Sequence, residues 1–199
     1  VLKYFDINDA VFHHNFVEFT AGTDQRAKNT YPYSFCTAGS KWRWRLDDAD
    51  TIFPIDNQGQ DRKPYWCEMH DYYDNGQPIW NGETSVFWNL LEQAFSVEIT
   101  AGMRKMFAAM ESLCGQSSGT PYDKAYAFYK KYYLGIKEYF PATLVNSDAK
   151  RYELAKIAYD NDSYSNDTDP ITQSHGDFYS AETAWMKKRI MYIMSKYNY

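Results

Sequence analysis

Four side chains suited to binding a divalent metal ion follow one another in the first part of the chain. The stretch TDQRAKN places Asp24 five positions before Asn29, and RLDDAD adds Asp48 and Asp50 further along. Carboxylate and amide oxygens are the ligands that Mg²⁺ prefers, and waters and substrate phosphates fill its other positions. An aspartate and an asparagine at this spacing, with a second acid beyond a hairpin, are typical of phosphoryl-transfer sites. The spacing alone is a weak pattern, and the simpler interpretation is a pair of polar loops.

The residues before Asp24 predict a helix that would hold this loop. In DINDAVFHHNFVEFTAGT, apolar side chains recur at spacings of four and five residues, as on one face of a helix. Asp6 or Asn8 is suited to cap its first turn, and Gly22 is suited to end it. The adjacent histidines at 13 and 14 would diverge on a helix and so would not share a metal ion. We expect them to be core or surface side chains.

The residues that follow the loop predict a β-hairpin. Bulky and polar side chains alternate in Tyr31 to Cys36 and in Lys41 to Leu46, on either side of a turn that contains Gly39. This hairpin, at about 31–46, would carry the acidic cluster at the end of its second strand. Between Ile55 and Asn81, turn dipeptides follow one another closely, so we expect short strands or a functional loop there.

The rest of the chain is mainly helical in pattern, and Ser85 is a natural N-cap for the next helix. The alternating strand–helix rhythm of a nucleotide-binding βαβ array is missing. The predicted fold class is therefore α+β, predominantly α, with about five helices and one short hairpin. Beyond the first helix, we predict a helix pair over 85–95 and 96–115, further helices over 121–135, 147–159 and 180–199, and a polar loop at 160–176.

Apolar spacing also predicts which side chains face the core. Core filling is the expected role of most large aromatic side chains, such as Trp88. The stretch YDKAYAFYKKYY is different, because it carries tyrosine on nearly every face of a helix. One core contact does not bury that much aromatic surface, so we expect this helix to dock against another chain or domain. The predicted inward positions are Val11, Phe12, Phe16, Val17 and Phe19 in the first helix, Val86, Phe87, Leu90, Leu91 and Phe95 in the second, and Val97, Ile99, Met103, Met106, Phe107, Met110 and Leu113 in the third.

Composition narrows the function classes. An aromatic content of 19% provides ample apolar area for a folded core. The formal net charge of -5 argues against nonspecific nucleic-acid binding, which needs a basic surface. No apolar run approaches the roughly 18 residues that span a bilayer. Cys36, Cys67 and Cys114 lack zinc-ligand spacing and cannot complete a disulfide framework, so we expect buried free thiols.

Longer stretches carry a family resemblance. GTDQRAKN, KWRWRLDDADT, IDNQG and WNGETSVFWNLLEQAF resemble the kinase-like domains of the spore-coat protein H (CotH) group. The sequence of these stretches is similar to a branch of the group found in large tail-associated proteins of tailed phages, including crAss-like phages. The closing KKRIMYIMSKY is similar to that branch as well. The resemblance covers residues 1 to about 115 and the last twenty.

The resemblance implies a kinase-type C-lobe that uses Mg²⁺ and ATP. Asp24 would take the catalytic position, Asn29 and Asp48 the metal positions, and Asp50 a supporting one. Arg26 and Lys28, inside the loop, could contact a phosphate, although solvated charge is the simpler interpretation for both. A glycine-rich phosphate loop and a strand lysine paired with a helical glutamate are not found in these 199 residues. Such parts would precede Val1.

The expected domain organisation is a CotH-like C-lobe core at 1–115 and a helical continuation at 116–199. Because the chain starts with Val and stops on a helical pattern, we expect it to be part of a longer polypeptide. The leading function hypothesis is a structural component of a phage tail, made in the host cytoplasm, that binds other tail subunits or copies of itself. The alternatives are a Mg²⁺- and ATP-dependent protein phosphotransferase and, more weakly, a carbohydrate-recognising module.

Overall fold

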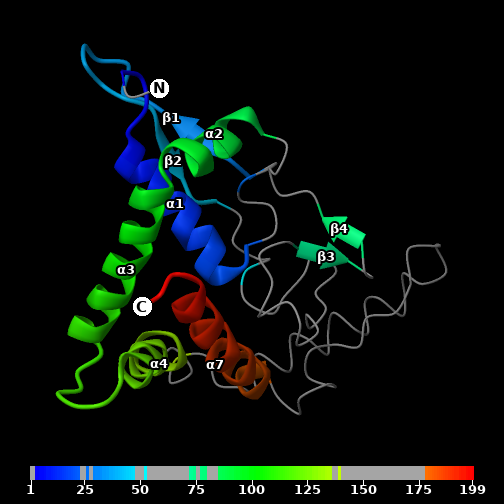
Figure 1. The fold of residues 1–199 in the computed structure, drawn as a ribbon, viewed down its shortest axis with the longest axis vertical. Coiled ribbons are helices and arrows are strands. Elements are labelled where there is room, and N and C mark those ends of the chain that lie inside the picture. The colour runs from blue at the N-terminus through cyan, green and yellow to red at the C-terminus, as the bar shows by residue number, and fades with distance from the viewer. Residues whose placement is uncertain are drawn as a thin grey trace.

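The computed structural model describes residues 3–22, 26, 29–47, 52, 72–74, 77–79, 85–135, 139 and 178–199. This part of the chain is mostly helical, with two short antiparallel hairpins (Figure 1), which confirms the predicted α+β, predominantly α class. The predicted helix at 147–159 and the polar loop at 160–176 lie outside the described residues. The helices are α1 (Ile7–Thr20), α2 (Val86–Ala94), α3 (Ser96–Leu113), α4 (Pro121–Tyr132) and α7 (Phe178–Lys196), and the strands are β1 (Tyr31–Tyr33), β2 (Arg43–Arg45), β3 (Tyr72–Asp74) and β4 (Gln77–Ile79).

The first hairpin forms where the sequence predicts it, with shorter strands. β1 and β2 are antiparallel, and Pro32 lies opposite Trp44. Gly39, in the connecting turn, has a φ of +80°, a conformation that glycine adopts without steric cost. β3 and β4 form a second antiparallel hairpin with Tyr72 opposite Ile79, which confirms the expectation of short strands in that region.

Helix α1 is central and is bordered by α3, α7 and β2 (Figure 1). The Asp6 carboxylate caps it by accepting a hydrogen bond from the Asp9 amide at 3.3 Å. The predicted stop at Gly22 is one residue late, because Ala21 adopts the left-handed conformation with a φ of 52°. The amide of Gly22 then donates to the Val17 carbonyl at 3.1 Å, which closes a Schellman motif.

Helices α1 and α3 approach each other closely at Gly102. A Cβ atom at this position would lie 2.7 Å from Asn15 Nδ2 and 2.8 Å from a methyl carbon of Val11. The same Asn15 amide donates to the Ile99 carbonyl at 2.9 Å. Because real Cβ contacts are never this short, the helix contact requires glycine at 102.

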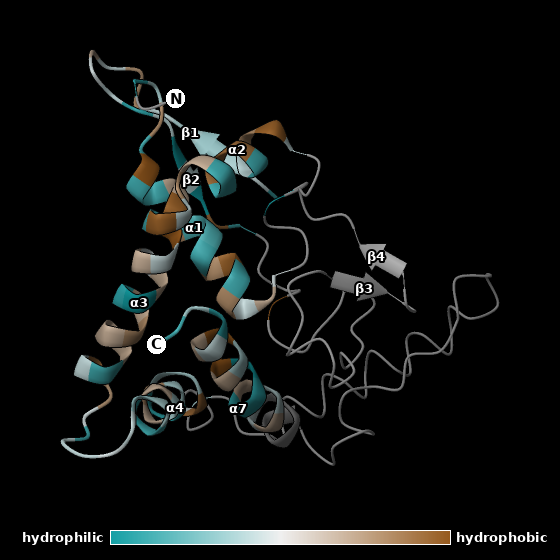
Figure 2. Ribbon diagram, in the orientation of Figure 1, coloured by the Kyte–Doolittle hydropathy of each residue, from teal (hydrophilic) through white to brown (hydrophobic). Residues whose placement is uncertain are grey.

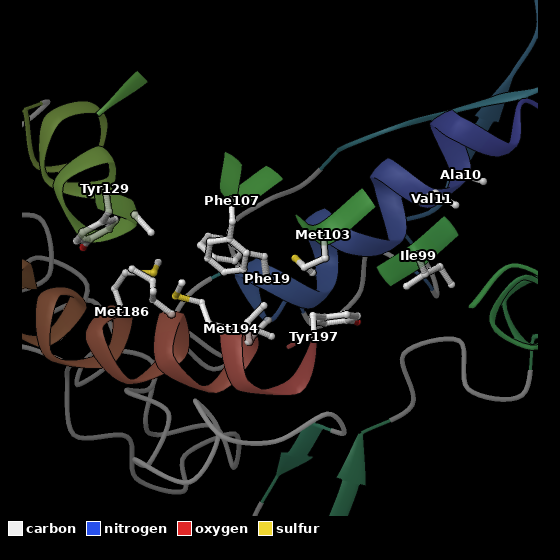
Figure 3. Packing of buried hydrophobic residues seen from close by; sticks show 14 of the residues in the cluster. Ala10, Val11, Phe19, Ile99, Met103, Phe107, Tyr129, Met186, Met194 and Tyr197 are labelled. Atoms are coloured by element: carbon white, nitrogen blue, oxygen red, sulfur yellow. The ribbon is translucent and has the colours of Figure 1, made fainter. Parts of the chain in front are cut away.

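The core joins all five described helices to β2. It contains Trp88 and Phe107, as expected, with Phe87 and Phe95 partly buried against it. Figure 3 shows Phe19 and Phe107 in contact near the middle of this cluster, and their ring centroids are 5.9 Å apart. Five predicted inward positions are wrong, because each helix has more apolar residues than its contacts cover: the exposed ones are Phe12, Val86, Leu90, Val97 and Leu113.

The chain ends beside α3. The Arg104 side chain donates to the carbonyl of Tyr197 at 3.1 Å and to that of Asn198 at 3.2 Å. α7 also contacts α1 and α4, so this helix links the two sides of the helical bundle. Trp185, Met186, Ile190 and Ile193 form its buried face.

Candidate functional site

The predicted metal and phosphate residues are only partly within the described chain. Asn29 is 6% exposed and lies just before β1. Asp24, Lys28, Asp48 and Asp50 lie outside the described residues, so their predicted roles stay predictions. Among the residues that the structure does describe, no group of three or more His, Cys, Asp and Glu side chains is placed to hold a metal ion. The predicted ligands, which are the amide of Asn29 and the carboxylates of Asp48 and Asp50, are of the kind that Mg²⁺ prefers.

Arg26, the other described residue of this loop, is held inside the protein. Its side chain is 5% exposed, and its Nη1 lies 3.2 Å from Glu92 Oε1 on α2. The indole nitrogen of Trp88, also on α2, donates to the Arg26 carbonyl at 3.0 Å. Both the backbone and the guanidinium of Arg26 are therefore anchored to one helix. As a phosphate ligand, Arg26 would have to share its guanidinium with Glu92.

Glu92 also binds helix α1. Its Oε1 lies 3.0 Å from Nε2 of His14, and the other ring nitrogen of His14 faces the Asn15 amide oxygen at 3.2 Å. His13 stacks on Trp88, which also lies on α2, with ring centroids 5.4 Å apart. Both histidines are buried, which confirms that they are core side chains. Glu92 thus connects α2 to α1 and to the loop at once.

A second buried charge group fixes the end of α1. Glu18 and Arg189 are fully buried. The guanidinium of Arg189, on α7, donates to the Glu18 carbonyl and, at 3.3 Å, to the Phe19 carbonyl. Lys196 pairs with the Glu18 carboxylate at 2.6 Å. The carbonyl groups at a helix end need donors, and α7 supplies them from far along the chain.

The two charge groups are close enough to act on one hydroxyl. Burial, and after it the Glu18 carboxylate, raises the pKa of Tyr197, while Arg26 and Arg189 lower it and Glu92 raises it. Tyr197 therefore stays a neutral hydroxyl at physiological pH. Buried ion pairs cost desolvation energy, so such a concentration of charge at one place is a common mark of a functional site. In Figure 2, hydrophilic and hydrophobic residues alternate along α1.

The β1–β2 hairpin is anchored to the opposite end of α1. The Trp44 amide donates to the Asp9 carboxylate at 2.6 Å, and Arg43 pairs with Asp6 at 3.3 Å. The Trp44 ring is buried and lies 4.6 Å from that of Phe87. After β2 the chain reaches Asp47, whose carboxylate lies 3.8 Å from Arg45. The hairpin thus leads from Asn29 to the start of the acidic cluster on a rigid support.

The outer face of this hairpin carries exposed tyrosine and arginine side chains. The strand register places Tyr31 opposite Arg45 and Tyr33 opposite Arg43. Because alternate residues of a strand share a face, these four side chains lie on the face opposite the buried Trp44. The two tyrosines are 47% and 39% exposed. Phe35, Trp42 and Tyr4 add further exposed aromatic surface beside them. We call Tyr31, Tyr33, Arg43 and Arg45 the outer hairpin face.

The tyrosine rings of helix α4 mostly contact other residues of the chain, and the docking of this helix against another chain or domain stays a prediction. Tyr126 and Tyr129 stack with centroids 6.2 Å apart, and Tyr129 and Tyr133 with centroids 5.0 Å apart. Within α4, Tyr132 is the exposed tyrosine, at 52%. The rings stack on one another and pack on α3 and α7, so much of their surface is covered within the chain.

Sequence reasoning missed Glu18, Glu92 and Arg189. A signal for Arg189 exists, because it lies four residues after Trp185 and one before Ile190, on the apolar face of its helix. A cation on an apolar face is rarely buried without a partner. For Glu92 no such signal exists, since its partners lie 66 and 78 residues away in sequence. Of the cysteines, Cys114 is buried and free as expected, and Cys36 is free but exposed.

No family model, curated protein or solved structure matches the chain. None of the helices in the described residues has the length and apolar character needed to cross a membrane.

Proposed function

We propose that this chain is an interaction module on a kinase-like scaffold and a structural component of the tail of a tailed phage. Its partners would be other tail subunits or copies of itself. The outer hairpin face is the observation that carries the proposal. Tyrosine and arginine are enriched in protein interfaces and in the few residues that dominate binding energy.

The outer hairpin face is held rigidly by the contacts of Trp42 and Trp44, and this rigidity favours binding. Trp42 exchanges backbone hydrogen bonds with the segment before α1, donating to the Tyr4 carbonyl at 2.8 Å and accepting from the Asp6 amide at 2.9 Å. Trp44 fixes the same strand to the core. A rigid surface loses little conformational entropy on association, so more of its contact energy appears as affinity. Arg43 and Arg45 pair with carboxylates of their own chain, but their side chains are still 48% and 70% exposed. They therefore also suit carboxylates on a partner, and with its net charge of -5 a second copy of the chain has such side chains.

The test is self-association measured by sedimentation across micromolar to high micromolar concentrations, with tail proteins of the same virion added in parallel. We expect the Tyr31→Ser, Tyr33→Ser double variant to weaken binding about thirtyfold or more, since even one hot-spot residue contributes about 2 kcal/mol. Tyr139→Ser, at a tyrosine that is 79% exposed, is the matched control and should bind as the unmodified chain does. A chain that stays monomeric and binds no tail protein would overturn the proposal.

A second candidate function is the Mg²⁺- and ATP-dependent phosphotransferase. The observation that favours it is the anchoring of the loop at its start, by the Schellman motif at Ala21, and at its middle, by the contacts of Arg26 with α2. Catalysis needs its groups held in place by such support. In this hypothesis Asp24 orients the acceptor hydroxyl, and Asn29, Asp48 and Asp50 hold the metal ion that stabilises the transferred phosphoryl charge.

Two measurements test the phosphotransferase. Transfer of labelled phosphate from ATP in the presence of Mg²⁺ should be lost in Asp24→Ala and in Asp48→Ala. A nucleotide- and Mg²⁺-dependent rise in melting temperature should be lost in Asp48→Ala and kept in Asp24→Ala. The reason is that Asp48 is one of the proposed metal ligands and Asp24 is not. Neither transfer nor a melting shift by the unmodified protein would remove this candidate.

A further inference from the structure

A cavity of about 290 Å³ lies between α1, α3, α4 and α7, and its described wall includes no residue of the outer hairpin face. One wall residue, Phe19, accepts a hydrogen bond from the buried Arg189 through its carbonyl. Methionine side chains enter its wall from two helices, Met106 and Met110 from α3 and Met186 from α7. Figure 3 shows Met186 and Tyr129 on neighbouring helices, and both line the space. None of the described residues in the wall carries a charge.

Two of the hydroxyl groups in the wall are hydrogen-bonded to the backbone. The Thr20 hydroxyl, which borders the cavity, donates to the Phe16 carbonyl at 2.8 Å. The Tyr132 hydroxyl is directed to the Leu113 carbonyl at 3.4 Å. These two hydroxyls are already engaged with the backbone, and the other side-chain polar groups of the described wall are the hydroxyls of Tyr129 and Tyr133. An apolar occupant would gain the dispersion contacts that the facing side chains lack.

Aromatic rings and methionines make up most of this wall. Phe16, Phe19 and Phe128 contribute their rings from α1 and α4. Aromatic edges and faces, and methionine sulfurs, all make favourable contacts with another aromatic ring. Methionine side chains also adapt their shape, so the space can adjust to its ligand.

We propose that this cavity is a binding site for an uncharged, mainly aromatic molecule. An apolar cavity of about 150 Å³ holds benzene, so 290 Å³ has room for a bicyclic molecule of about ten non-hydrogen atoms. A carboxylate or ammonium group on the ligand is disfavoured, because the wall offers it no opposite charge. The described wall shares no residue with the outer hairpin face or with the proposed metal site, so the inference does not depend on the proposed function.

The first test uses indole as the probe and methyl-labelled methionine in NMR spectra of the full chain. Indole at up to millimolar concentration should shift the methyl signals of Met106, Met110 and Met186. The signals of Met103, which is fully buried in the core, and of Met191, which is 52% exposed, should stay in place. Indole-3-acetate, the matched anion, should shift the three methyl signals far less.

The second test fills the space. Ala125 lines the cavity and is 1% exposed, so Ala125→Leu should raise the melting temperature by a few degrees and reduce the indole affinity at least tenfold. Ala108→Leu, on the exposed face of α3, is the matched control and should leave the affinity unchanged. If Ala125→Leu fails to fold, the methyl shifts of the unmodified chain still decide the matter. The proposal is overturned if indole shifts none of the three signals, shifts Met191 equally, or binds Ala125→Leu as well as the unmodified chain.

Discussion

The two sides of α1 are packed differently: one is held by buried polar contacts, and the other is apolar and borders a cavity. Toward α2, the helix buries His14, and the carboxylate of Glu92 joins this histidine to Arg26. Toward α4, it presents Phe16 and Phe19 to a space that its neighbours do not fill. The polar side is tightly connected because each buried charge needs a partner. The apolar side tolerates empty space, since nothing but dispersion is lost there. The same helix therefore fixes the position of the loop through its polar side and borders the cavity with its apolar side.

The largest expected effect would come from Arg189, the buried cation at the end of α1. Arg189→Met would remove the guanidinium that donates to the Glu18 and Phe19 carbonyls. We expect the free energy of unfolding to fall by about 3–5 kcal/mol, because two hydrogen bonds from a charged donor, each about 1.5–3 kcal/mol, are lost. Urea denaturation measures this. Lys188→Met, at the exposed neighbour, should change stability by less than about 0.5 kcal/mol.

Truncations on the apolar side would test whether it is partly empty. Met103→Ala, in the filled core, should cost about 3 kcal/mol, since it removes buried atoms and creates a cavity. Met110→Ala, beside the existing space and only partly buried, should cost about half as much. Both values come from urea denaturation. Equal costs would mean that the two sites are packed alike, against the comparison drawn above.

Removing the negative charge of Glu92 would measure how much its contact with Arg26 stabilises the polar side of α1. Glu92→Gln keeps the shape and one acceptor oxygen but takes the anion away from Arg26. We expect a loss of about 1–2 kcal/mol, because the Glu92 side chain is 38% exposed and water partly replaces the lost interaction. Glu98→Gln, on an exposed position of α3, controls for the change in net charge. A loss in the control as large as in Glu92→Gln would argue against a special role for this carboxylate.

The smallest effect is expected at the start of α4, which closes the apolar side. The Thr120 hydroxyl accepts from the Asp123 amide at 3.2 Å, and the Asp123 carboxylate accepts from the Thr120 amide at 2.9 Å. Thr120→Ala should cost about 1 kcal/mol in thermal unfolding, as for other N-cap residues. Ser118→Ala, in the preceding exposed turn, serves as the control.

The same cap predicts a pH dependence. Hydrogen bonds from the Thr120 side chain and backbone lower the pKa of Asp123 below its ordinary value of 3.8. A lowered pKa stabilises the folded state above the ordinary value, and this stabilisation is lost as the pH falls through the folded-state pKa. The melting temperatures of the unmodified chain and of Asp123→Asn should therefore converge in acid. A gap that stays constant from neutral pH down to strong acid would contradict the role of the carboxylate.

Local pattern was enough to predict most elements. The Asp6 cap, the β1–β2 hairpin and the starts of α2 and α4 depend on residues that lie close together in sequence. The position of the left-handed residue was missed by one, because Gly22 is the usual choice and Ala21 takes the role. The exposed Val97 shows the limit of periodicity, since an apolar position is buried only where another element covers it.

The sequence by itself determined most of the described helices and the first hairpin, because these follow from spacing, caps and turns between near neighbours. It also determined that aromatic side chains would exceed what one core needs. Only the tertiary structure decided which partners the charges take. Glu92 meets Arg26, and Arg189 meets the end of α1, across 66 and more than 160 residues of chain. Such pairings depend on how helices pack, and the same packing decided that one side of α1 would be filled and the other left open.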